Sequence, residues 1–125
     1  MHITDFQLQH VEYTLKEQPL EIATFEFSVK QEKAVSMPDK GKETFCILKN
    51  HLSVLQKGKD GKEQKVLTLN LEYKVFLDVQ GEKKLDPKTM CEYANKMMSS
   101  AICSDINFYL SNAHLPWFPL DRFPS

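Results

Sequence analysis

The chain has almost no arginine and few glycines. Arg122 is the one arginine among 16 basic residues, and 17 acidic residues bring the formal net charge to −1. Nucleic-acid-binding proteins usually carry a basic stripe and use arginine on phosphates and base edges, so we expect no nucleic-acid partner. The four glycines, Gly41, Gly58, Gly61 and Gly81, all fall in expected turns. The sequence therefore offers no glycine-rich phosphate loop.

Long apolar runs and paired cysteines are also missing. No stretch of about 20 apolar residues could span a bilayer, and the first ten residues lack the apolar core of a signal peptide. The three cysteines, Cys46, Cys91 and Cys103, are odd in number and widely spaced. This pattern fits a reducing compartment better than a disulfide framework. We expect a cytoplasmic protein without membrane insertion.

Patterns that carry catalysis or bind metals are absent as well. The four histidines fall in separate expected elements, and none stands at a metal-ligand spacing such as CxxC or HExxH. No GxSxG motif is present. Glu12, Glu26 and Glu72 alternate with apolar residues, which is more typical of a solvated strand face than of a catalytic carboxylate pair. The sequence thus predicts no metal, no cofactor and no enzymatic activity.

What the sequence does contain is alternation with a period of two. Its 125 residues, 42% hydrophobic and 26% charged, predict one globular domain over residues 1–125. Alternating apolar and polar residues dominate the first two thirds, a pattern that predicts β-strands. Four strands are expected, over residues 3–15, 22–33, 43–55 and 66–79. We expect them to follow one another as an antiparallel meander.

Turn signals and one phase slip refine this arrangement. Asp60 and Gly61 stand between the third and fourth strands, a pair that favours a hairpin with a primed turn. Further turns are expected around Pro38 and Gly81. In the first strand, Phe6 and Leu8 occupy one phase, whereas Val11, Tyr13 and Leu15 occupy the other. A β-bulge is the simplest cause, since one extra residue reverses the side-chain phase.

After the last strand the period becomes helical. Asp86 is a good N-cap and Pro87 a good first helical residue, and no proline or glycine follows before Asn112. Two adjoining apolar stripes are expected, one formed by Met90, Ala94, Met97, Ala101, Ser104 and Phe108, the other by Met98, Ile102, Ile106 and Tyr109. The tail holds three prolines and cannot continue the helix. The expected fold class is α+β, a four-stranded antiparallel meander sheet followed by one long C-terminal helix packing across it.

The strands carry more apolar surface than one helix can cover. Apolar residues occupy both phases, as with Phe6 against Val11 and Leu48 against Ile47, and a single helix layer covers only one sheet face. Large exposed apolar patches usually mark interfaces, so we expect a homo-oligomer with surface left for a partner. Alternatively, a twisted sheet curls over the helix and hides both sets.

The element order and several segments resemble the SecB family of export chaperones. FQLQHVEYTLKE is similar to the family's first strand, phase slip included, and ETFCILKNHLSVLQ with QKVLTLNLEYKVFLDVQG resembles its third and fourth strands. AICSDINFYLSNAHLPWFPLDRF is similar to the second half of its helix and the apolar, proline-containing exit. The resemblance implies a SecB-like domain with a four-stranded antiparallel sheet, a long helix after the fourth strand and a tetramer built as a dimer of dimers.

The resemblance also implies a function. It is that of an ATP-independent holdase, a chaperone that binds unfolded or precursor polypeptides in a hydrophobic groove, with a place in protein export. The expected client-binding residues are Phe6, Leu8, Phe27, Phe76, Trp117 and Phe118. The family docks on the SecA motor through an acidic sheet surface and the C-terminal region. A net charge of −1 and a chain that ends at Ser125 without an acidic tail make that docking less expected here.

Two other functions remain open at this point. One is a homo-oligomeric adaptor for a single specific partner, for example an antitoxin. The other is a small-molecule-binding or enzymatic α+β domain, which would need a deep pocket with convergent polar groups.

Overall fold

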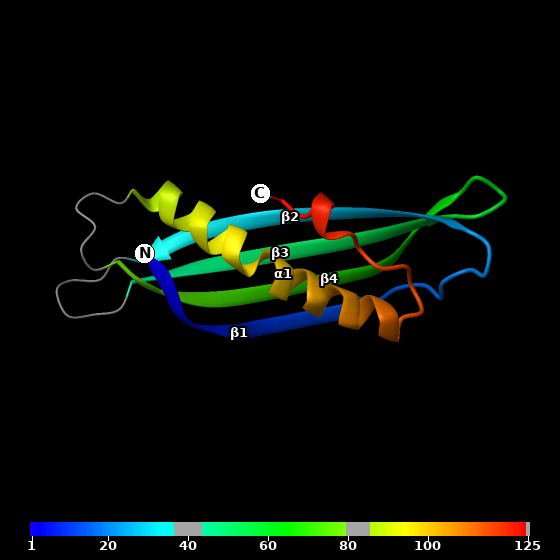
Figure 1. Ribbon diagram of the computed structural model, residues 1–125. Coiled ribbons are helices and arrows are strands. Elements are labelled where there is room, and N and C mark those ends of the chain that lie inside the picture. The colour runs from blue at the N-terminus through cyan, green and yellow to red at the C-terminus, as the bar shows by residue number, and fades with distance from the viewer. Residues whose placement is uncertain (37–43, 80–85, 125) are drawn as a thin grey trace.

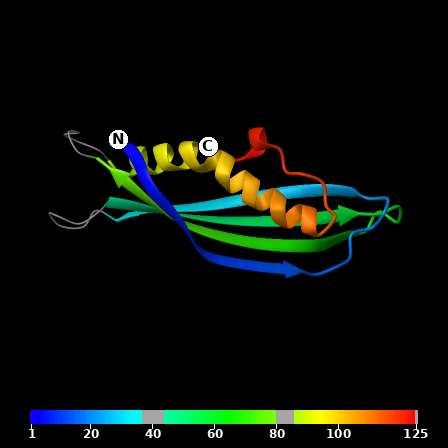
Figure 2. The ribbon, with the colours of Figure 1, turned by 60° about the horizontal axis from the view of Figure 1, so that its bottom comes forward.

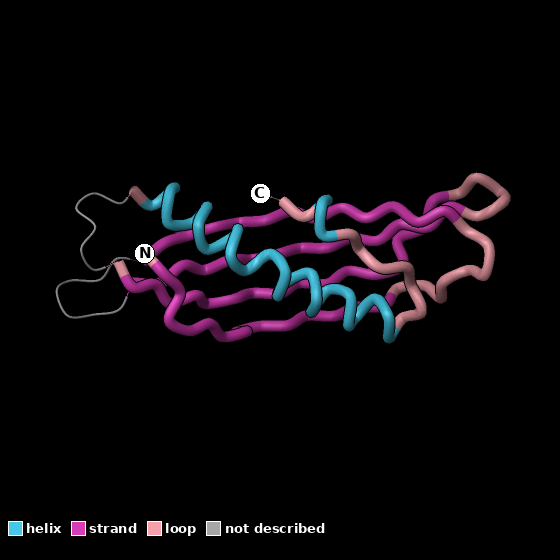
Figure 3. Tube along the Cα trace, viewed as in Figure 1, coloured by secondary structure: helices cyan, strands magenta, loops and turns pink. Residues whose placement is uncertain are grey.

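Four long antiparallel strands and one long helix form the protein. The computed structural model describes residues 1–36, 44–79 and 86–124. The elements are β1 (His2–Leu15), β2 (Thr24–Ser36), β3 (Thr44–Lys57), β4 (Glu63–Asp78), α1 (Pro87–Asn112) and the 3₁₀ turn η1 (Leu120–Arg122). The helix packs across the sheet (Figures 1 and 3). The α+β class and the C-terminal helix are confirmed, and the turns expected around Pro38 and Gly81 lie outside the described residues.

The strand order differs from the prediction. The sheet has the order β1-β4-β3-β2, so β2, β3 and β4 form a meander, but β1 lies beside β4 and the meander prediction was wrong for this strand. The link between β1 and β2 is held by Gln56, whose side chain is only 1% exposed. Its Nε2 donates to the Gln18 carbonyl at 3.2 Å and its Oε1 accepts from the Leu20 N–H at 3.0 Å. These two bonds hold the link at the end of the sheet, where the chain passes from β1 at one edge to β2 at the other.

The predicted bulge in β1 is confirmed. The pairing of β1 with β4 shifts register between Ile3 and Asp5, and again between Leu8 and His10. Each shift inserts an unpaired residue, which returns the following side chains to the face used before it. The change of phase along β1 therefore does not mean a change of sheet face.

The hairpin between β3 and β4 forms where it was expected, with a different turn. The Gly61 N–H donates to the Gly58 carbonyl at 3.1 Å, and Gly61 has φ +77°. Among the described residues, only Gly61 and His114 have positive φ. Asp60 therefore lacks the second positive φ of a primed turn, and instead its Oδ1 accepts from the Lys62 N–H at 3.1 Å.

Helix α1 begins and ends as the sequence predicts. The Asp86 carboxylate accepts from the Thr89 N–H at 2.7 Å, and this bond lowers the pKa of that carboxyl group. At the other end, Leu115 donates to the Leu110 carbonyl and His114 to that of Ser111, a Schellman motif with His114 in the left-handed position. Within the described residues, no helix is both long enough and apolar enough to cross a bilayer.

The core lies between α1 and one face of the sheet. Alternating residues of β3 and β4 are buried there, including Leu48, Leu52, Leu69 and Leu71. Along α1 the buried apolar stripe consists of Met90, Cys91, Ala94, Met98, Ile102, Cys103, Ile106 and Leu110. The stripe expected through Met97, Ser104 and Phe108 was wrong in part, because Met97 is 56% exposed and Phe108 61% exposed.

Candidate functional site

Helix α1 crosses the sheet diagonally. Near its start, the Asn95 Oδ1 accepts from Gln31 of β2 at 2.6 Å. Near its end, the ring of Tyr109 lies 5.6 Å from that of Tyr13 in β1. The helix thus runs from one edge strand to the other (Figure 1). A diagonal element leaves two opposite corners of the same sheet face beyond its reach, one on β1 and one on β2.

The corner on β1 is apolar and exposed. Phe6, Leu8 and Val11 pair with Val75, Tyr73 and Leu71, and these three β4 residues are buried beneath the helix. Residues directly opposite each other in an antiparallel pair share a face, so the β1 residues lie on the helix side. We call this row the β1 strip, which consists of Phe6, Leu8, Val11, Tyr13 and Leu15. Its side chains are 36% to 48% exposed.

The apolar surface continues onto the flank of the helix. The Phe108 ring lies 5.4 Å from that of Tyr109, which in turn lies 5.6 Å from that of Tyr13 in β1. Met97 stands eleven residues before Phe108, which at 100° per residue is about 20° more than three full turns, so both lie on the same side of the helix. Phe108 therefore adjoins the β1 strip through Tyr109, and the exposed side chain of Met97 lies on the same side of the helix.

The corner on β2 is covered by the chain itself. After α1, residues 113–124 return over β2, and we call them the exit segment. Figure 2 shows it on the same side of the sheet as the helix. Three of its side chains, Leu115, Phe118 and Phe123, are no more than 8% exposed. The Phe118 ring meets the ring of Phe27 edge to face, with centroids 6.0 Å apart.

Side-chain amides of α1 hold the backbone of the exit segment. The Asn107 Oδ1 accepts from the Phe118 N–H at 2.7 Å, and its Nδ2 donates to the Phe118 carbonyl at 3.1 Å. The Asn95 Nδ2 donates to the Pro124 carbonyl at 2.7 Å. Trp117 points outward, 72% exposed, and its Nε1 donates to the Ser111 hydroxyl at 2.9 Å.

The predicted client-binding residues divide among three places. Phe6 and Leu8 are neighbours in the exposed β1 strip. Phe27 and Phe118 pack against each other beneath the exit segment, with Trp117 on its outer side. Phe76 lies on the opposite face of the sheet, its ring centroid 6.2 Å from that of Phe45. On that face the ammonium group of Lys74 stands 4.1 Å from the Phe45 centroid and 5.1 Å from the Phe76 centroid.

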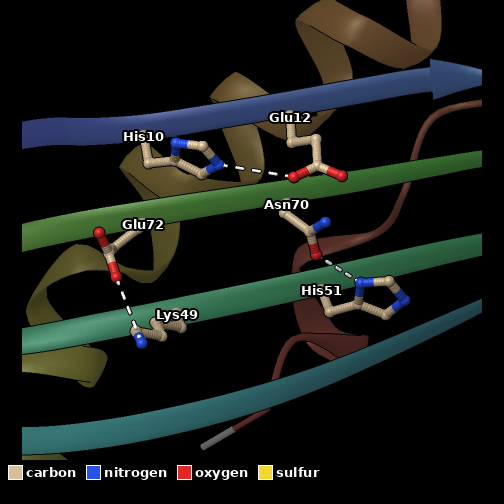
Figure 4. A network of polar contacts seen from close by, with 6 residues as sticks. All are labelled: His10, Glu12, Lys49, His51, Asn70 and Glu72. Atoms are coloured by element: carbon tan, nitrogen blue, oxygen red, sulfur yellow. Dashed lines mark hydrogen bonds and ion pairs between the residues drawn. The ribbon is translucent and has the colours of Figure 1, made fainter.

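The central part of the face opposite the helix is polar. A shallow depression there is lined by His10, Glu12, Lys30, Glu32, Lys49, His51, Asn70 and Glu72. In Figure 4, Lys49 pairs with Glu72 at 3.6 Å, His10 with Glu12 at 3.6 Å, and the His51 Nδ1 lies 2.5 Å from the Asn70 Oδ1. Acidic and basic groups alternate, and within the described ranges no three His, Cys, Asp or Glu side chains are grouped to hold a metal. This depression suits an apolar polypeptide poorly.

Several residues of these surfaces were missed by sequence reasoning. Val11 was assigned to the second phase of β1, and the bulge returns it to the side of Phe6 and Leu8. Met97 and Phe108 were placed in the helix core because their spacing also fits a buried stripe. Asn95 and Asn107 carry no sequence signal, since an asparagine within a helix is usually a solvated side chain.

Comparisons with known proteins bear on the fold. Searches of family models and of curated proteins found no match. Among solved structures, the chain is similar to the Mycobacterium tuberculosis Rv1957 SecB-like chaperone, in a complex with a ChAD peptide from the Rv1956 HigA1 antitoxin. The TM-score is 0.71 at 16% identity, over 99% of this chain and 91% of the other. The protein thus has a SecB-like fold.

Proposed function

We propose that the protein is an ATP-independent holdase that binds unfolded or precursor polypeptides through apolar surface. The observation that carries this proposal is the β1 strip, whose five apolar side chains lie on the helix side of the sheet yet remain 36% to 48% exposed. Contiguous exposed apolar surface of this kind usually marks an interaction site. Phe108 extends it onto the helix through Tyr109.

The size of the strip favours a homo-oligomer. Fully burying a large apolar side chain stabilises a complex by about 1.5–3 kcal/mol, so covering the exposed part of each strip residue adds roughly 1 kcal/mol. Five such contributions are offset in large part by the ordering of an unfolded client. Several strips acting on one client chain raise its effective affinity. We therefore propose a dimer or tetramer, in which β1 at the sheet edge is available for pairing with a second copy.

The depression on the face opposite the helix carries both acidic and basic side chains. We therefore propose that the protein holds its clients without docking on the SecA motor. Lys30 and Lys49 stand among the carboxylates of that face, so it lacks the uniformly acidic surface that SecB-family docking uses. We place the activity in the cytoplasm, because all three cysteines are free and buried.

Suppression of aggregation tests this proposal. We expect the protein to lower the light scattering of an aggregating, chemically denatured client without ATP, and Phe6→Ser with Leu8→Ser to abolish most of the effect. Ile22→Ser is the matched control, because Ile22 is equally apolar and 67% exposed but lies outside the β1 strip. Undiminished scattering with the wild-type protein, or full activity of the double variant, would contradict the proposal. Solution mass, measured alongside, reports the oligomer.

A second candidate function is an adaptor for one specific partner. The structural similarity to a SecB-like chaperone bound to an antitoxin peptide favours it. Titration calorimetry separates the two functions. A holdase binds several unrelated unfolded chains with similar affinity, whereas an adaptor binds one partner tightly and denatured proteins hardly at all.

A further inference from the structure

The face of the sheet opposite the helix carries its charged side chains in two rows that cross all four strands. Each row is formed by residues that pair directly across neighbouring strands and therefore share a face. From β1 to β2, the first row consists of His10, Glu72, Lys49 and Glu32. The second row consists of Glu12, Asn70, His51 and Lys30. Figure 4 shows the members of both rows on β1, β4 and β3.

Each charged row is complementary to its own reverse. Read from β1 to β2, the first row presents an imidazole, a carboxylate, an ammonium group and a carboxylate. Read from β2 to β1, the same row presents acidic groups where the forward row has basic ones. The second row begins with the Glu12 carboxylate and ends with the Lys30 ammonium group, and its two middle members, Asn70 and His51, can exchange a hydrogen bond.

A second copy of the chain presents these rows in reverse. When two sheets stack face to face about a twofold axis that runs along the strands between β4 and β3, each row meets itself backwards. Glu12 then faces Lys30 of the second copy, and Lys30 faces its Glu12. The strands of the two sheets run in the same direction, as in aligned sheet packing.

The rows on either side fit the same axis. Toward one end of the sheet, Phe45 and Phe76 pair across β3 and β4, so each aromatic ring meets the other kind from the second copy. Toward the other end lies a row of hydroxyl groups, which consists of Thr14, Thr68, Ser53 and Ser28. The row through Lys74 and Ile47 is the exception, but the Lys74 ammonium group stands over the aromatic row, 4.1 Å from the Phe45 centroid.

The charges of the face are accessible to a partner. The side chains of Glu12 and Lys49 are 63% and 58% exposed, and Lys30 and Glu32 are exposed as well. Glu12 and Lys30 lie on opposite edge strands, three strand spacings or about 14 Å apart. An attraction between these two residues is therefore possible only between two molecules.

We propose that this face docks a second copy of the chain, stacked sheet to sheet about a twofold axis parallel to the strands. The inference goes beyond the proposed holdase function, and the interface is separate from pairing at the β1 edge. Four strands are about 19 Å wide, and the rows from Phe45 to Ser53 are about 26 Å long. Such a face buries roughly 1,000 Å² in total, which is the size of a weak interface. The helix sides point outward, so both β1 strips stay accessible.

Charge reversal on the full-length protein tests the pairing. Lys30→Glu and Glu12→Lys each set like charges against each other at two places across the axis. By sedimentation velocity in about 50 mM NaCl, we expect each variant to associate at least about tenfold more weakly than the wild-type protein. An equimolar mixture of the two variants should associate again, within about threefold of wild type, because each supplies the charge that the other has lost.

Two controls accompany the mixture. Lys96→Glu makes the same change of charge at an exposed position of α1, on the other side of the sheet, and should associate like wild type. Wild-type association should weaken about tenfold in about 500 mM NaCl, because salt screens exposed charges. Pairing at the β1 edge uses backbone groups, which all these variants retain. A mixture no heavier than either variant alone, or a wild-type protein with no salt-sensitive association, would overturn the inference.

Recovery in the mixture also identifies the axis. A twofold axis across the strands sets Glu12 against His10 and Lys30 against Glu32 of the second copy, and the mixture then stays dissociated. The proposed holdase function is tested apart from this. If the mixture stays dissociated while the wild-type protein still suppresses client aggregation, the holdase proposal stands and this inference falls. If Phe6→Ser with Leu8→Ser loses suppression but keeps the salt-sensitive association, the inference stands with the β1 strip as a separate surface.

Discussion

Tyr13 in β1 and Tyr109 near the end of α1 hold their rings 5.6 Å apart, with planes tilted by 31°. The contact lies where the helix reaches the edge strand, opposite Leu69 of β4. Phe6 pairs with Val75, six residues further along β4, or about 20 Å at 3.3 Å per residue. Together with the bond between Gln31 and Asn95 at β2, this contact marks the diagonal of the helix and, with it, the part of β1 that stays uncovered.

A double-mutant cycle on this pair measures how firmly the diagonal is held. Tyr13→Ala and Tyr109→Ala should each destabilise the protein in urea unfolding, with a coupling energy of about 0.5–1 kcal/mol, since aromatic pairs contribute this much beyond burial. Ile22→Ala combined with Tyr109→Ala is the control, and their effects should add, because separated sites do not couple. Additive effects for the tyrosine pair would mean that the helix end is placed by other contacts.

Local signals predicted the elements of the fold well. The alternation of β4 and the capping pair of Asp86 with Pro87 depend on neighbouring residues, and both elements formed within a few residues of their predicted bounds. The helix stripe was harder, because Met97 and Met98 both fit a 3.6-residue period. Only the direction of the helix over the sheet decides that Met98 is buried and Met97 exposed.

Long-range relationships were beyond local signals. β1 lies beside β4 and β2 at the other edge of the sheet, and the link between β1 and β2 is held by Gln56, a glutamine that looks like an ordinary strand residue. Phe6 and Leu8, predicted to bind clients, lie exposed on the helix side of the sheet, whereas Phe76, chosen on the same reasoning, lies on the other face. Alternation shows which residues of a strand share a face of the sheet. It does not show which of the two faces the helix covers.

Replacement of Gln56 tests its role in the strand order. Gln56→Ala should destabilise the protein by about 1–3 kcal/mol, because it removes two hydrogen bonds, to the Leu20 N–H and the Gln18 carbonyl, that contribute about 0.5–1.5 kcal/mol each. Amides of residues 16–23 should lose exchange protection more than those of β3 and β4. Gln64→Ala is the comparison, because Gln64 touches Gln56 at 3.3 Å but holds no backbone group of the link in the described contacts. If both variants lose the same stability and exchange protection, the effect comes from polar packing in general and not from the bonds that Gln56 makes to the link.

The end of α1 offers a stabilising change. His114 occupies the left-handed position of the Schellman motif with φ 58°, which favours glycine. His114→Gly should raise the free energy of unfolding by up to about 1 kcal/mol, the backbone strain relieved being partly offset by the greater freedom of glycine in the unfolded chain. Asn112→Gly is the opposite control, because it places glycine inside the last helical turn and should destabilise the protein. A lower stability of His114→Gly would mean that the imidazole itself contributes a contact.

The buried thiols make stability fall at alkaline pH. Burial raises the pKa of Cys46 from its ordinary value of 9.0 to about 12, and burial likewise raises the pKa of Cys91 and Cys103. Because the unfolded thiol ionises above pH 9 while the folded one stays protonated, the stabilising difference is complete below pH 9 and is lost as the pH rises toward 12. The Cys46 thiol can remove up to about 1.4 kcal/mol per pH unit in that window, and Cys91 and Cys103 act in the same direction.

Urea unfolding between pH 8 and pH 10.5 tests this directly. Wild-type stability should be flat near pH 8 and decline above pH 9, with the decline shared by the three thiols and by Tyr73, whose pKa is also raised by burial. Cys46→Ala should be less stable at pH 8, because it leaves a small cavity at a fully buried position, but it should lose less stability on going to pH 10.5. If the stability of the variant and that of the wild-type protein decline with the same slope, the Cys46 thiol ionises at the same pH in the folded and unfolded states. The site of Cys46, where β3 packs against α1, is then more open to water than its burial implies.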